Sequence, residues 1–116
     1  MTHIVTPALV RQYLLATGWT VGERGFLVKS TRQVGLFEAM TAYDIDHEID
    51  KVAHMERSSR SEMAARLGML AAAEMLIAVA PNAATGGERS TLLVQARHLV
   101  EAASVDPEAW EKARGQ

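Results

Sequence analysis

The feature that most constrains this sequence is an almost wholly apolar stretch, Leu67–Ala80, which is interrupted by one carboxylate, Glu74. Ser59 and Glu62 precede it with the spacing of a capping box, and a proline follows it, so we predict one helix over residues 60–80. Fourteen residues that include a charge are too few to span a membrane. We therefore expect a buried central helix and no membrane partner.

Small side chains are regularly spaced along this predicted helix. Ala64, Gly68 and Ala72 recur every fourth residue, so they share one helix face. A face of small residues lets a second helix approach closely. The pattern favours helix–helix contacts, and we expect a homodimer.

The N-terminal segment begins with a helix whose two ends are both marked. Thr6 can cap it, Pro7 suits its first turn, and Gly18 suits the position just beyond its last turn. Two short segments of β type follow, residues 19–21 and 26–29, on either side of a glycine-containing turn. This arrangement predicts a short β-hairpin.

Helical patterns cover the remainder after an ambiguous connection. Residues 34–41 fit either a third strand or the lead into a helix, and the sequence leaves both open. From Ala42 the apolar residues recur with helical spacing. They form two stripes that should face the core: Ile45, Ile49 and Val52, and then Leu92, Leu93, Ala96, Leu99, Val100 and Ala103. Thr85, at the spacing of a second capping box, begins another predicted helix, and Asp106, followed by proline, begins a last short one.

The predicted fold class is α+β and mostly α: an N-terminal helix and short β-hairpin, followed by a four-helix, Ala-rich helical body. Five of the six aromatic residues lie in the first 43 positions, so the core of the N-terminal part should be aromatic. We expect a single domain over residues 1–116, with a head (1–41) and a helical body (42–116).

Composition excludes several classes of function. The chain has no cysteine, which rules out disulfides, a thiol nucleophile and thiolate metal sites. Lys and Arg number 12 against 14 Asp and Glu, so there is no broad basic surface for non-specific nucleic-acid binding. Neither a phosphate-binding loop nor a nucleophile elbow occurs. The first residues lack the pattern of a signal peptide, and we expect a cytoplasmic protein.

Two oppositely charged segments are the candidate binding surfaces. His47, Asp50 and His54 share one helix face, but a metal site needs ligands from a second element, and none is identifiable. We therefore predict a solvated acidic face, no metal and no cofactor. The partner-binding residues that we predict lie on this acidic face and on the basic hairpin: Asp46, His47, Asp50, His54, Arg24, Lys29 and Arg32.

Glu74 is the other candidate, because a carboxylate in an apolar helix needs a partner or a raised pKa. Arg97 or His98, on the next predicted helix, are the partners that we expect. Either a structural role at a helix–helix interface or a role as a general acid or base fits the sequence.

A part of the chain resembles a known family. Lys51–Leu67 contains an Arg57-Ser58 turn, then a Ser61-Glu62-Met63 helix start and an Arg-aliphatic pair one turn later. This is similar to the helix–turn–helix part of Arc-type ribbon-helix-helix proteins. The resemblance implies an intertwined dimer, with Arg57, Arg60 and Ser61 near a DNA phosphate and a paired strand that reads the major groove.

The predicted reading strand departs from that family. The same register places it at Leu36–Thr41, with Leu36, Glu38 and Met40 pointing toward the bases. The family has polar or basic residues at these positions, whereas two of these side chains are apolar and one is an anion.

Three hypotheses about function follow. The first is a small non-enzymatic regulatory protein that acts through a protein–protein surface as an inhibitor, adaptor or accessory factor, in size and style like proteins that phages and mobile elements encode. The alternative is a ribbon-helix-helix-like DNA-binding regulator or antitoxin. The third is an enzyme that uses Glu74 as its acid or base.

Overall fold

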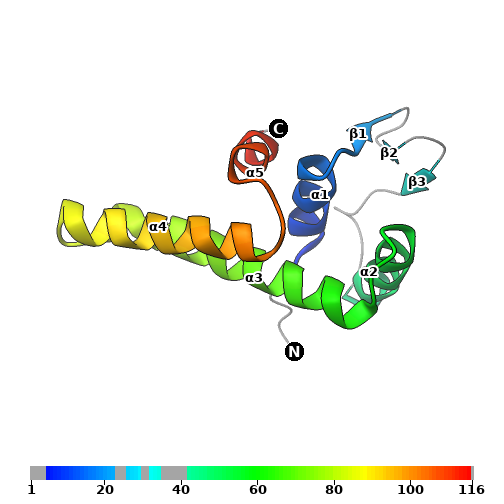
Figure 1. Cartoon of the computed structure of the whole chain (residues 1–116), viewed down its shortest axis with the longest axis horizontal. Helices are drawn as coiled ribbons and strands as arrows, with labels where there is room; N and C mark the ends of the chain where they lie inside the picture. The colour runs from blue at the N-terminus through cyan, green and yellow to red at the C-terminus, as the bar shows by residue number, and fades with distance from the viewer. Residues whose placement is uncertain (1–4, 23–25, 30–31, 35–41, 116) are drawn as a thin grey trace.

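The computed structural model describes residues 5–22, 26–29, 32–34 and 42–115 of the chain (Figure 1). Their order is one helix, three short strands and a helical remainder, which confirms the predicted fold class. The elements are α1 (Pro7–Ala16), β1 (Thr20–Val21), β2 (Leu27–Lys29), β3 (Arg32–Val34), α2 (Ala42–Met55), α3 (Arg60–Val79), the 3-10 turn η2 (Ala80–Asn82), α4 (Gly86–Ala102) and α5 (Pro107–Arg114).

The sheet extends the predicted hairpin by one strand. β1 and β2 pair antiparallel, with Thr20 opposite Val28, as the hairpin requires. β3 then pairs antiparallel with β2, with Val34 opposite Leu27. This third strand ends at Val34, the first residue of the segment that the sequence left open between strand and helix, and residues 35–41 lie outside the described part of the chain.

The predicted helix caps are present because each depends only on neighbouring residues. The backbone amides of Leu9, Glu62, Glu88 and Ala109 donate, each over 3.1–3.2 Å, to the cap side chains of Thr6, Ser59, Thr85 and Asp106. At the end of α1, the amide of Trp19 bonds to the carbonyl of Leu14 across Gly18, whose φ is +106°. Short-range chemistry thus fixes where the helices begin and end.

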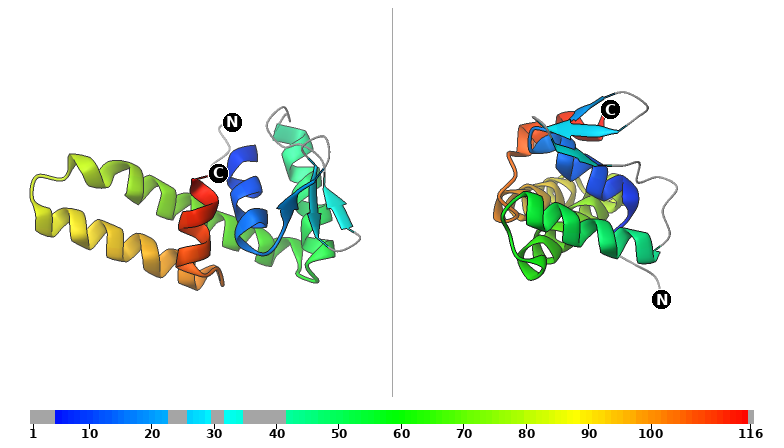
Figure 2. Two further views of the ribbon diagram at one scale, coloured as in Figure 1. Left: turned by 90° about the horizontal axis from the view of Figure 1, so that it is seen from above. Right: turned by 90° about the vertical axis from the view of Figure 1, so that its right-hand side faces the viewer.

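The head and the body share one core. Val10 and Leu14 of α1 and Leu27 of the sheet are completely or almost completely buried, in one cluster with Leu67 and Leu70 of α3. α1 packs against both α3 and α5. In Figure 2, α5 crosses the helical body beside α1, so the last helix covers part of the first.

The outer halves of α3 and α4 form a projecting two-helix arm (Figure 1). Here the expected buried central helix is only half correct. α3 and the following turn, Arg60–Asn82, have the length and composition of a membrane-crossing helix, but only 33% of an apolar window of 18 residues within them is buried. The reason is that the outer half of α3 packs mainly on α4, and two helices cannot enclose all of their apolar surface.

Candidate protein-binding groove

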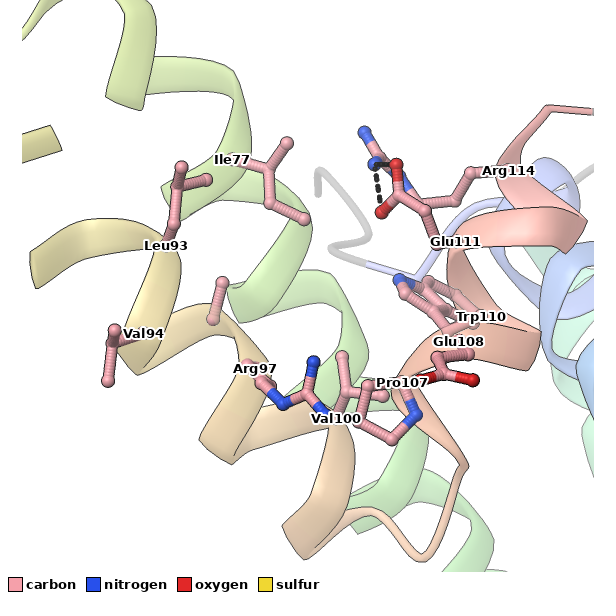
Figure 3. A pocket seen from close by; sticks show the side chains of 11 residues that line it. Ile77, Leu93, Val94, Arg97, Val100, Pro107, Glu108, Trp110, Glu111 and Arg114 are labelled. Carbon is pink, nitrogen blue, oxygen red and sulfur yellow. Dashed lines mark hydrogen bonds and ion pairs between the residues drawn. The ribbon is translucent and has the colours of Figure 1, made fainter. Parts of the chain in front are cut away.

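A groove of about 540 Å³ lies where α5 crosses the arm. Figure 3 shows Ile77 and Leu93 on the arm side, Trp110 and Arg114 on the opposite side, and Val100 near the base. Its floor and walls are mainly apolar, and its rim is charged. The lining consists of Ile77, Leu93, Val94, Ala96, Arg97, Val100, Pro107, Glu108, Trp110, Glu111 and Arg114.

α5 is held in place as one wall of the groove by polar contacts with α3. Trp110 is 2% exposed, and its Nε1 donates to Oε1 of Glu74 over 3.1 Å. Nε of Arg114 lies 2.7 Å from the same carboxylate oxygen. Both Trp110 and Arg114 project from α5, so one carboxylate on α3 fixes the position of this wall.

The α4 wall presents apolar side chains to solvent. Leu93 is 44% exposed and Val94 is 53% exposed. The sequence placed Leu93 with Ala96 and Val100 on the core-facing stripe of the helix, and this assignment is wrong for Leu93. Ala96 and Val100 are buried, but Leu93 stands beside the groove, beyond the reach of α5.

The two walls carry different charges. On the α4 side, Nε of Arg97 pairs with Glu101 over 3.2 Å in an exposed ion pair. On the α5 side, Glu108 and Glu111 are exposed. Glu111 lies 3.3 Å from Arg114, whose shorter contact is with Glu74. The α5 edge therefore retains negative charge and the α4 edge a guanidinium.

Glu74 does not have the partners predicted from sequence. Arg97 pairs within its own helix, and the contacts of Glu74 come from Trp110 and Arg114 of α5, which lie further along the chain than the expected partners. The Glu74 side chain is 29% exposed, and it lies behind Trp110 and Arg114 in a separate hollow between α3 and α1. Its bonds with Trp110 and Arg114 give it a structural task.

The acidic face of α2 is where the sequence predicted it, at a distance from the groove. His47, Asp50 and His54 are exposed, and Asp46 is half-buried. Arg60, at the start of α3, lies 2.6 Å from Asp50 and 3.6 Å from Asp46. Within the described part of the chain, no group of three or more His, Asp or Glu side chains is placed to hold a metal ion.

Of the three basic hairpin residues predicted to bind a partner, Lys29 is the one whose side chain is described. Nζ of Lys29 lies 3.6 Å from Glu56 and donates to the carbonyl of Thr17 over 3.1 Å. Arg32 lies in β3, but its side chain is not among those described, and Arg24 lies outside the described residues. Lys29 is therefore partly occupied in holding the hairpin to α1 and α2.

The residues implied by the ribbon-helix-helix resemblance lie at the α2–α3 turn. Arg57 is exposed with φ +58°, and Ser61 is exposed in the first turn of α3. Arg60 is paired with two carboxylates of α2. A phosphate approaching this helix N-terminus would meet Asp46 and Asp50 beside the arginine, and like charges repel it.

The groove itself was missed in the sequence, although α4 carries a signal for it. Leu92, Leu93 and Val94 are consecutive apolar residues, and three in a row span about 200° of a helix, more than one core-facing stripe can hide. No protein-family model matches the chain, and comparisons with curated proteins and with solved structures likewise find no significant match.

Proposed function

We propose that this chain is a small non-catalytic binding protein whose groove, between α5 and the arm, receives an amphipathic helix of a partner protein. The observation that carries the proposal is the groove itself: apolar walls with Leu93 and Val94 exposed beside a fixed Trp110. Exposed apolar side chains that are contiguous and rimmed by polar groups are typical of interaction sites.

The charges of the rim define the partner. Glu108 and Glu111 on the α5 edge favour basic side chains along one flank of the incoming helix. On the α4 edge, the exposed pair of Arg97 with Glu101 is weak, so an acidic side chain on the other flank of the partner can compete for Arg97. The apolar stripe of the partner would cover Leu93 and Val94, as in other helix-in-groove complexes.

DNA binding has less support. Helix α2, the turn and helix α3 have the connectivity of the family that the sequence resembles, and Ser59 caps α3 as expected. The arginine at the start of α3, however, is paired with Asp46 and Asp50. Its charge is directed to the acidic face, which opposes a polyanion.

The test is capture from nuclease-treated lysate by the wild-type chain and by two variants of α4. Leu93→Glu places a charge on the groove wall, whereas Gln95→Glu places the same charge on the other side of α4. We expect one polypeptide that the wild type and Gln95→Glu retain and Leu93→Glu loses. Once that polypeptide is identified and purified, calorimetry should give the same order of affinities.

Retention that is equal for Leu93→Glu and Gln95→Glu would overturn the assignment to the groove. If the chain captures no polypeptide from the treated lysate and captures only nucleic acid from an untreated lysate, the proposal is overturned and the DNA-binding alternative is favoured. In that case, Arg57→Ala should weaken binding to duplex DNA, and the affinity should fall steeply with salt.

A further inference from the structure

The outer face of α3 is an apolar surface separate from the groove. Met75 is 64% exposed and Val79 is 50% exposed, one turn apart on the same side of the helix. Helical spacing aligns them with Gly68, Ala64 and Ser61 nearer the start of α3. Along this side, between residues 61 and 79, no ionisable residue occurs, since the charged residues of that span occupy other faces of the helix.

The backbone of α3 is accessible at the middle of this face. A Cβ placed on Gly68 would have no heavy atom of the described neighbours within 4 Å. Ala64 is exposed and Ala72 is half-buried, so among the described residues no side chain covers the small-residue face closely at Gly68 or Ala64. Within the described part of the chain, the close approach predicted from their spacing is thus not used at Gly68.

The sizes of the side chains on this face complement one another when the helix is reversed. The C-terminal half carries the large residues Met75 and Val79, and the N-terminal half carries the small residues Ser61 and Ala64. A two-fold axis between Gly68 and Ala72 places Met75 opposite Ala64 of a second copy and Val79 opposite its Ser61. A parallel arrangement would instead oppose large to large and leave gaps between the small residues.

We infer that the outer faces of two α3 helices pack antiparallel and make this protein a homodimer. The face has no charge to desolvate, and antiparallel helix dipoles attract each other. A membrane surface is a poorer match, because helices that lie on membranes carry Lys or Arg along their flanks and Trp or Phe on their apolar side. Met75, Val79 and the small residues between them and Ser61 have neither.

The expected affinity follows from the size of the contact. A helix of 20 residues is about 30 Å long, and a single helix-on-helix contact of that length belongs with the smaller specific interfaces, below about 1,200 Å². We therefore expect a dimer with a dissociation constant of about 1–100 μM. The groove lies between α3, α4 and α5 on another side of the arm, so each protomer would keep its groove open.

Sedimentation of the full chain over a range of concentrations tests the inference. The wild type should change from monomer to dimer, and Gly68→Leu should weaken the dimer at least tenfold because the backbones can no longer approach. Ala102→Leu is the matched control, because it places the same leucine side chain at an exposed position on α4, and it should leave the dimer intact. Circular dichroism should show all three folded, since Gly68 has open space around it.

The orientation is tested by cysteines, because the chain has none of its own. Ala64→Cys and Met75→Cys chains should form a disulfide with each other when they are mixed and little when each is oxidised alone. Cross-linking of Met75→Cys chains with themselves would overturn the antiparallel arrangement. A wild type that stays monomeric to about 1 mM overturns the dimer. A monomeric wild type that binds phospholipid vesicles, with the same affinity as Gly68→Leu, overturns it as well.

Discussion

Two tryptophans are held in the same way in two regions of the molecule. In the head, Nε1 of Trp19 donates to Glu56 at the end of α2 over 2.8 Å. Beside the groove, Nε1 of Trp110 donates to Glu74 over 3.1 Å. Each indole is at most 2% exposed, and each acceptor also lies beside a cation. We call these the head cluster (Trp19, Lys29, Glu56) and the groove cluster (Glu74, Trp110, Arg114).

The difference lies in the cation and in what surrounds the cluster. Lys29 stands 3.6 Å from Glu56 and its side chain is 38% exposed, whereas Arg114 stands 2.7 Å from Glu74 and is 25% exposed. The head cluster joins the sheet to α2 within the folded core. The groove cluster fixes one wall of an open surface. The same contacts thus stabilise the packing of the head in one cluster and position a wall of the groove in the other. Only the groove cluster should influence binding of a partner.

The largest effects should come from the tryptophans. Trp19→Ala and Trp110→Ala each remove a buried indole and leave a cavity, so each should lower the free energy of unfolding by about 3–5 kcal/mol. Chemical denaturation measures both. A loss below about 1 kcal/mol for one of them would show that the two clusters do not contribute alike to stability.

The milder pair of Trp19→Phe and Trp110→Phe separates stability from binding. Phenylalanine keeps most of the buried volume but removes the Nε1 donor, so both chains should remain folded. Affinity for the captured partner should fall for Trp110→Phe and stay unchanged for Trp19→Phe. An equal fall in affinity for both variants would contradict the expectation that only the groove cluster influences binding.

The carboxylates should have the next largest effect. Glu74→Gln keeps an oxygen for Trp110 but loses the charge facing Arg114, and should cost about 1–3 kcal/mol in unfolding free energy. Glu56→Gln should cost less, because Lys29 is more exposed and further away. Glu101→Gln, which removes only an exposed ion pair with Arg97, is the control and should change little. An unchanged stability in Glu74→Gln would reopen the reading of Glu74 as a general acid or base.

Sequence reasoning located the elements well because their ends are decided locally. Ser59, Thr85 and Asp106 cap helices through amides three residues away, and the stripe of Ile45, Ile49 and Val52 is buried as its spacing predicted. Such contacts depend only on helix geometry. Hence the order and bounds of the described helices could be read from the chain.

The partners of Glu74 and the groove could not be read in the same way. Glu74 and Trp110 are 36 residues apart, and their contact depends on how α5 crosses α3, which no local pattern encodes. Leu93 lies on the expected stripe but is exposed because the arm has two helices and no third layer. Burial is a property of the assembled layers, whereas periodicity reports only one helix at a time.

A smaller, stabilising effect is expected at two residues beside the clusters. Arg57, which follows Glu56, has φ +58°, and Ser104, which precedes α5, has φ +62°. Both end a helix in the left-handed conformation that glycine adopts without strain. Arg57→Gly and Ser104→Gly should each raise the free energy of unfolding by about 0.5–1 kcal/mol, seen as a rise in Tm. A fall in Tm for either would show that its side chain makes a stabilising contact.

The smallest expected effect is a difference in pH dependence within the head. Burial raises the pKa of Tyr13, and the nearby Arg66 guanidinium only partly opposes this. The folded state therefore holds the phenolic proton more tightly than the unfolded state, whose pKa is about 10. The resulting stabilisation is complete below pH 10 and is lost as the pH rises through the folded-state pKa. Unfolding measured at about pH 9 and 11 should show a steeper loss for the wild type than for Tyr13→Phe; equal losses would mean that the phenol is hydrated in the folded head.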